Sequence, residues 1–186
     1  MTVKDVIVYA FKLLGRDDVA ANILNEAELD KESTEKKETL LYCYNAVEDE
    51  LARYYFPLTE TQRLSSNSGK YSFDDFKYRP IKILSVKADG KPVKFSVNTK
   101  YLACAEKDVT VEYRYAPDKK QLSNVSEYDG YAVNESLIAA GILAEYCLIS
   151  GAVQASQSWE SRYREQIDKA QKKNRTPLSV PPRRWV

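Results

Sequence analysis

The fold is decided by residues 40–65, which read LLYCYNAVEDELARYYFPLTETQRLS. Up to position 55 the apolar residues recur at helical spacing, which predicts an amphipathic helix with the acidic run 48–50 on its solvent side. Pro57 ends this helix, because proline cannot donate the next backbone hydrogen bond. From Thr59 onward the apolar period is two, as in a strand. The sequence therefore predicts that a helical part gives way to a β-rich part at this point.

The β-rich part consists of short segments joined by turns. Strands are predicted at 59–65 and 70–73, on either side of a turn, and the Asp89-Gly90 pair is a strong hairpin signal further on. A last strand, rich in β-branched and aromatic residues, is predicted over 109–115. Because the turns are short and no crossover helix separates the strands, we expect an antiparallel meander.

Two helices are also predicted in the first part of the chain, before residue 30. The apolar spacing predicts one helix over 3–14 and a second over 19–29. The charged run 30–38 is either a solvated turn or the exposed start of the next helix, with Ser33 or Thr34 as its cap.

Two further helices are predicted after the β-rich part. The segment 133–149 is apolar over much of its circumference, so we expect it to be buried against more than one neighbour. Ser150-Gly151 bends or breaks it, and a second helix follows over 154–173. One stripe of that helix is apolar and contains Trp159, Tyr163, Ile167 and Ala170.

These elements predict an α+β fold, in which N-terminal helices and a C-terminal helix pair form a bundle around a central antiparallel β-meander insertion. One domain spans 1–173, with a helical part at 1–58, the insertion at 59–117, and a loop and helices at 118–173. The remaining segment, 174–186, contains three prolines and is expected to be an extended or disordered tail.

Composition narrows the classes of function. The chain has 186 residues, a formal net charge of +1 and no histidine. Cys43, Cys104 and Cys147 are scattered among apolar residues, which predicts buried thiols in a reducing compartment rather than disulfides or a metal site. No segment approaches the ~20 apolar residues that cross a bilayer, and the amino terminus lacks the apolar core of a signal peptide.

No set of residues predicts catalysis. Without histidine, the chain lacks the usual proton shuttle at neutral pH and the usual partner of a nucleophilic serine or cysteine. It also has no glycine-rich phosphate loop. Asp74-Asp75 offers carboxylate oxygens to a cation but lacks the pattern of a calcium loop. We therefore expect a protein that is not an enzyme and that holds no cofactor or metal.

A nucleic-acid-binding function is the alternative. Lysines and aromatic residues lie side by side at Lys77-Tyr78, Lys94-Phe95 and Lys100-Tyr101, and proteins that bind single strands combine basic grooves with stacking aromatics. Acidic residues in the same strands dilute any basic face. Ordinary strand alternation explains the same pattern without a ligand.

The tail carries the candidate interaction residues, which are Arg183, Arg184 and Trp185. Tryptophan and arginine are enriched at binding hot spots, and the preceding prolines keep such a segment extended. One hypothesis is a disordered end with a stray aromatic residue. The other is an arm that docks on a neighbouring subunit, and removal of residues 174–186 would then weaken oligomers without affecting the fold of the monomer.

The order of elements resembles that of the head–tail connector proteins of tailed bacteriophages and prophages, also called adaptor or head-completion proteins, including tail tubular proteins of the gatekeeper type. The likeness lies in the first helix with its Leu13-Leu14-Gly15, and in the long helix that ends in LARYYFPL at 51–58. It lies most in LIAAGILAEY at 137–146, followed by WESRY at 159–163.

This resemblance implies a structural protein of the virion neck, made in the host cytoplasm. Such proteins form a ring, commonly twelvefold, between the portal protein and the next neck or tail component, and DNA passes through the lumen without specific binding. The resemblance assigns no role to individual residues, because it is a likeness of fold rather than of fixed side chains.

Overall fold

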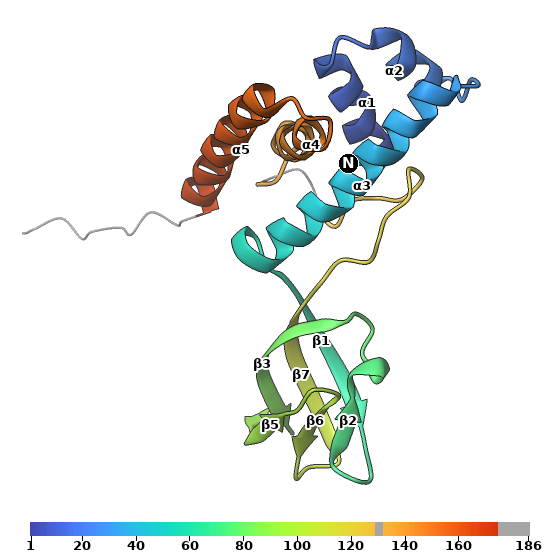
Figure 1. Cartoon of the computed structure of the whole chain (residues 1–186). Coiled ribbons are helices and arrows are strands. Elements are labelled where there is room, and N and C mark those ends of the chain that lie inside the picture. The colour runs from blue at the N-terminus through green and yellow to red at the C-terminus, as the bar shows by residue number, and fades with distance from the viewer. Residues whose placement is uncertain (129–131, 175–186) are drawn as a thin grey trace, which may run out of the picture. The chain divides into compact units, whose positions relative to one another are not determined.

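The structure is a computed structural model that describes residues 1–128 and 132–174. Helices and antiparallel sheets make up the chain, which confirms the α+β class (Figure 1). The chain groups into two compact units. The helical unit comprises residues 1–43 and the part of the chain from 122 onward, and the sheet unit comprises residues 44–121.

The first two helices belong to the helical unit. Helix α1 (Val3–Leu13) matches its prediction and begins with a capping box, in which the Asp5 N–H donates to the Thr2 hydroxyl over 3.1 Å. Helix α2 (Asp17–Leu24) is shorter than the predicted 19–29. It ends early because Glu26 adopts a φ of 55° and the Ala27 N–H donates back to the Asn22 carbonyl over 2.9 Å.

The helix that leads into Pro57 is longer than its apolar spacing indicated. Helix α3 (Lys31–Glu50) includes most of the charged run 30–38, which is therefore an exposed helix start rather than a turn. Its cap is Asp30, whose carboxylate accepts the Ser33 N–H over 2.7 Å, so the prediction of Ser33 or Thr34 as the cap was wrong. A π-helical turn, η1 (Leu51–Tyr55), follows and closes with a bond from the Phe56 N–H to the Leu51 carbonyl.

The predicted C-terminal helix pair is confirmed as α4 (Glu135–Ile149) and α5 (Val153–Asn174). Most of α4 is buried, as its apolar circumference indicated, and it packs against both α1 and α5. Tyr163, Ile167 and Ala170 of the predicted stripe are buried on α5. Ser156 joins them, and its hydroxyl donates to the Ala144 carbonyl of α4 over 2.9 Å.

The first residues of the chain are tied to a segment far along it. The Val3 N–H donates to the Asn124 carbonyl over 3.1 Å, and the Ser126 N–H donates to the Met1 carbonyl over 3.2 Å. This antiparallel bridge joins Thr2 to Val125. The helical unit is therefore closed by contacts between residues more than 120 positions apart.

The sheet unit contains two antiparallel sheets. One has the order β1-β7-β3-β4 and the other the order β2-β6-β5. The strands are β1 (Leu58–Ser65), β2 (Lys70–Ser72), β3 (Pro80–Ala88), β4 (Lys91–Pro92), β5 (Phe95–Val97), β6 (Tyr101–Cys104) and β7 (Asp108–Tyr115). The Asp89-Gly90 hairpin is confirmed between β3 and β4. The turn at 66–69, by contrast, does not join paired strands, because β1 pairs with β7 and β2 pairs with β6.

Tyrosines build much of the sheet-unit core. Tyr71 and Tyr113 are fully buried with Val86, Leu102 and Val111, and Tyr115 lies at the border of the same cluster. This arrangement explains the high tyrosine content of the middle of the chain by packing, because aromatic residues suit half-buried strands.

Candidate functional site

The structure places no metal-binding cluster within residues 1–128 and 132–174. No group of three or more histidine, cysteine or acidic residues in these ranges is arranged to hold a metal ion. Asp74 and Asp75 lie in a short 3-10 turn, η2 (Phe73–Asp75), which the Ser72 hydroxyl caps by accepting the Asp74 N–H. The doublet therefore supplies the second and third residues of this turn.

The three cysteines Cys43, Cys104 and Cys147 are buried, which confirms the burial predicted from the sequence. Burial raises the pKa of the Cys43 thiol to about 11, and the nearby Glu145 carboxylate adds to the shift. Burial likewise raises the pKa of Cys147. Because the thiolate is the nucleophilic form, these side chains are not poised to react at neutral pH.

Glu48 overturns one sequence prediction. The run 48–50 was expected on the solvent side of its helix, but Glu48 is only 1% exposed and accepts a 2.9 Å hydrogen bond from the Tyr44 hydroxyl. The spacing contained the signal, because Glu48 follows Tyr44 by four residues and precedes Leu51 by three. Its position is therefore on the apolar face of α3.

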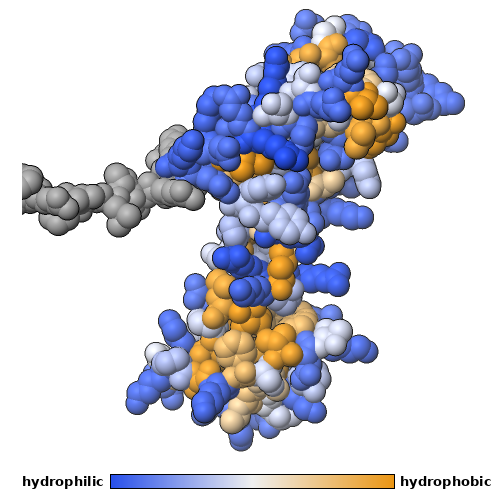
Figure 2. Space-filling model, turned by 60° about the vertical axis from the view of Figure 1, so that its left-hand side comes forward, coloured by the Kyte–Doolittle hydropathy of each residue, from blue (hydrophilic) through white to orange (hydrophobic). Residues whose placement is uncertain are grey.

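A mixed apolar and basic surface lies along the edge strands of the sheet unit. We call it the β3–β5 face, and it consists of Ile81, Leu84, Phe95, Val97, Lys82, Lys87, Lys91 and Lys94, all of them exposed. Figure 2 shows hydrophobic side chains gathered over the sheet unit, with hydrophilic ones projecting around them. The two edges are neighbours in the fold, because the Val93 N–H donates to the Val86 carbonyl of β3 just before β5 begins.

Two irregularities in β3 create part of this face. The pairing of β3 with β7 shifts register between Pro80 and Lys82 and again between Ile83 and Ser85. Ile81 and Leu84 are the extra residues at these bulges, and both remain more than a third exposed. A regular alternation would have buried one face of the strand, so the bulges are the reason that these two apolar side chains reach solvent.

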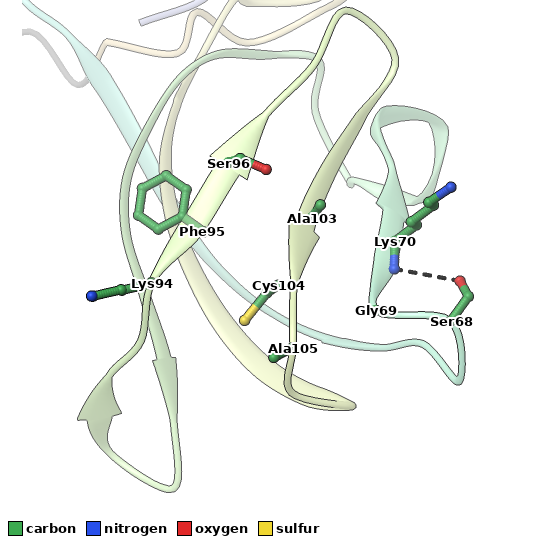
Figure 3. Close-up of a pocket in the computed structure, with 9 residues that line it drawn as sticks. All are labelled: Ser68, Gly69, Lys70, Lys94, Phe95, Ser96, Ala103, Cys104 and Ala105. Atoms are coloured by element: carbon green, nitrogen blue, oxygen red, sulfur yellow. Dashed lines mark hydrogen bonds between the residues drawn. The ribbon is translucent and has the colours of Figure 1, made fainter.

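A shallow hollow of about 390 Å³ continues the surface on the second sheet. Figure 3 shows its two lysines, Lys70 and Lys94, on opposite sides, with Ala103, Cys104 and Ala105 between them. The hollow therefore combines an apolar floor with positive charge at both ends. It is open to solvent, which suits a contact surface better than an enclosed ligand site.

The turn between α4 and α5 carries a second apolar surface. Leu148, Ile149 and Val153 are each about half exposed there, within a run of six residues that contains no charge. We call these three residues the α4–α5 tip. Neither surface was predicted, because sequence periodicity indicates which residues are apolar but not which of them are left uncovered.

Most aromatic residues of the lysine–aromatic pattern are engaged within the chain. Tyr78 stacks on Tyr115 with ring centroids 4.3 Å apart, and the Lys77 ammonium lies over the Tyr78 ring while pairing with Glu60. The Lys70 ammonium lies over Tyr101. Phe95 differs from them in having an exposed ring.

No protein-family model matches the sequence, and comparison with curated proteins finds no match. The predicted interaction residues Arg183, Arg184 and Trp185, together with the tail from residue 175, lie outside the described residues. Within the described ranges, no helix combines the length and the apolar character needed to cross a bilayer.

Proposed function

We propose that this protein is a structural protein of the neck of a tailed phage or prophage, where it forms a ring between the portal protein and the next neck or tail component. The observation that carries the proposal is the order of the two units along the chain. Both described ends of the chain belong to one helical unit, and the residues between them form an antiparallel sheet unit. The resemblance noted in the sequence rests on this same order of elements.

The exposed apolar surfaces support a role in assembly. The β3–β5 face and the α4–α5 tip each bring several large apolar side chains into solvent, and protein interfaces commonly have an apolar centre with a polar rim. The subunits of a ring contact each other through two different surfaces, so a ring protein that also binds a portal needs more than one such surface.

The charge of the chain suits a conduit for DNA. With a formal net charge of +1, the protein has no strong overall attraction for the phosphate backbone. A ring of such subunits would guide DNA through its lumen without retaining it. Its task in the completed head would be mechanical, namely to extend the portal channel and to offer a docking surface to the tail.

Co-assembly with a portal protein tests the proposal. The chain would be co-expressed with the portal protein of the same phage or prophage, and the complex would be purified by size and imaged by negative-stain electron microscopy. We expect an additional ring on the portal. A portal that stays bare, together with a gene neighbourhood that lacks portal, capsid and tail genes, would refute the proposal, whereas a monomer in isolation would not, since connector subunits can assemble only on their partner.

The alternative, binding of single-stranded nucleic acid, has weaker support. Stacking requires accessible rings, and Tyr78, Tyr113 and Tyr115 are engaged in the sheet-unit core or its border. Titration of the protein with a fluorescent oligonucleotide near physiological salt would decide this point. A flat titration removes the alternative, and a salt-dependent affinity would favour it over the neck function.

A further inference from the structure

The β3–β5 face carries an excess of positive charge. Residues 80–100 include five lysines and a single acidic residue, Asp89. All five lysines are exposed, and none is within salt-bridge distance of a carboxylate in the part of the chain that the structure describes. Four of them, Lys82, Lys87, Lys91 and Lys94, lie in the same segment, residues 81–97, as the exposed apolar side chains of the face. The face therefore has the chemistry of a docking surface for an acidic partner that also carries apolar side chains.

The geometry of β3 argues against a partner that adds a strand. No described strand pairs with the outer side of β3 over residues 80–85, so an edge is available. However, the bulges at Ile81 and Leu84 interrupt the regular spacing of the ladder, and Lys82 lies between them. Bulges and edge lysines are the features by which natural sheets prevent strand addition. The partner is therefore one that presents side chains, such as the surface of a helix.

The same chain has a segment of the opposite sign, which comprises α2, the connection at 25–30 and the first turns of α3. Residues 17–38, which we call the acidic segment, contain eight acidic residues and three lysines, and all eight carboxylates are exposed. Several are already paired, for example Glu32 with Lys36. Asp17, Glu28 and Glu38 have no cation within salt-bridge distance among the described residues. Leu24, which is 48% exposed, supplies an apolar side chain within the segment.

We propose that the β3–β5 face of one copy of this chain binds the acidic segment of a second copy. The two surfaces are opposite in sign, and the exposed Leu24 of the acidic segment can meet the exposed apolar side chains of the β3–β5 face. The contact joins different surfaces, so a bound pair still has one free surface of each kind, and the interaction continues into a ring or an open chain. This inference rests on the proposed function, because it names the contact between neighbouring subunits of that ring.

Charge-reversal variants test the contact in the full-length protein. K82E/K94E makes the β3–β5 face acidic, E28K/E38K makes the acidic segment basic, and K107E/K119E is a matched control that reverses two exposed lysines elsewhere in the sheet unit. Self-association is measured by sedimentation velocity over a range of protein concentration, at low and at physiological salt. Far-UV circular dichroism verifies the fold, and K82Q/K94Q replaces K82E/K94E if the reversal unfolds the protein.

We expect the wild type and the control to associate alike, and less strongly as salt rises. Each reversed variant alone should lose at least about tenfold in association constant at low salt, because like charges then face each other. An equimolar mixture of K82E/K94E and E28K/E38K should regain association, since each reversed surface matches the reversed surface of the other variant. If the β3–β5 face bound the acidic segment of its own copy, mixing the two variants would not restore association, because each variant would still carry two surfaces of like charge.

Several results would overturn the inference. These are a wild type that stays monomeric at every concentration while its ring on the portal is unaffected by the reversals, a K82E/K94E variant that associates like the control, and a mixture without rescue. Loss of oligonucleotide binding in K82E/K94E with unchanged self-association would assign the face to nucleic acid instead. If every charge-reversed variant still forms a ring on the portal, this contact is refuted and the neck function stands. If the mixture regains association but no ring forms on the portal, the contact is supported and the neck function is refuted.

Discussion

Replacement of Gly69 by alanine is expected to unfold most of the sheet unit. Gly69 has a φ of +67°, and a Cβ atom at this position would overlap the carbonyl oxygen of Cys104. The Cys104 N–H donates in turn to the Gly69 carbonyl over 2.9 Å. The new methyl group would therefore push apart two backbone segments that hold β2 against β6.

The magnitude follows from two costs. The left-handed backbone alone costs an alanine about 1–2 kcal/mol. Relief of the overlap requires the backbone around Cys104 to move, which costs a further 1–3 kcal/mol or so by analogy with overpacked cores. The total is roughly 2–5 kcal/mol, and its upper end equals the whole stability of a marginally stable small domain, which is about 5 kcal/mol.

Gly90 provides the matched control. Its φ is +77°, but nothing lies within 4 Å of a Cβ built there, so Gly90→Ala should cost only the backbone term. Hydrogen exchange of the β6 and β7 amides is the appropriate assay, because both tryptophans, Trp159 and Trp185, lie outside the sheet unit. Equal loss of protection in the two variants would refute the close approach of Gly69 to Cys104.

Three further predictions concern the helices. Tyr44→Phe removes a donor to the buried Glu48 carboxylate, so it should lower the free energy of unfolding by about 1–3 kcal/mol in urea titrations; a change below about 0.5 kcal/mol would contradict the bond. Burial raises the pKa of Cys43 to about 11, so the folded protein keeps a proton that the unfolded chain releases from about pH 8.5. The contribution of this thiol to the free energy of unfolding should therefore be fully present below that pH and be lost, by about 2–3 kcal/mol, as the pH rises toward 11. The loss should be smaller in Cys43→Ala if the thiol causes it. L148S/I149S at the α4–α5 tip should leave unfolding within about 0.5 kcal/mol of the wild type but weaken assembly on the portal; unchanged assembly would show that the tip is not a contact.

The sequence predicted best those features that depend on neighbouring residues. The change from helix to strand at Pro57, the Asp89-Gly90 hairpin and the apolar circumference of α4 all follow from local spacing or turn chemistry. Helix ends were less predictable. The end of α2 depends on Glu26 in a left-handed conformation, which glycine more often adopts, so no residue type marked it.

Features that depend on residues far apart in the sequence could not be predicted from the spacing of apolar residues. β1 pairs with β7, and Ser65 lies opposite Asp108, so their register depends on residues more than forty positions apart. The bulges at Ile81 and Leu84 depend on a different long-range pairing, that of β3 with β7. The candidate surfaces were missed for this reason. Glu48 differs, because its spacing from Tyr44 placed it on the apolar face and its charge alone suggested otherwise.

The bridge between Thr2 and Val125 has a consequence for biosynthesis. The sheet unit is one continuous stretch, 44–121, and can fold soon after it leaves the ribosome, because domains generally fold as units during translation. Helix α1 emerges earlier but has no bridging partner until residues 124–126 are made, and no α4 to pack against until later still. Until then α2 is its packing partner, so the side chains Val6, Ile7 and Phe11 lack the cover of α4 while more than a hundred further residues are translated.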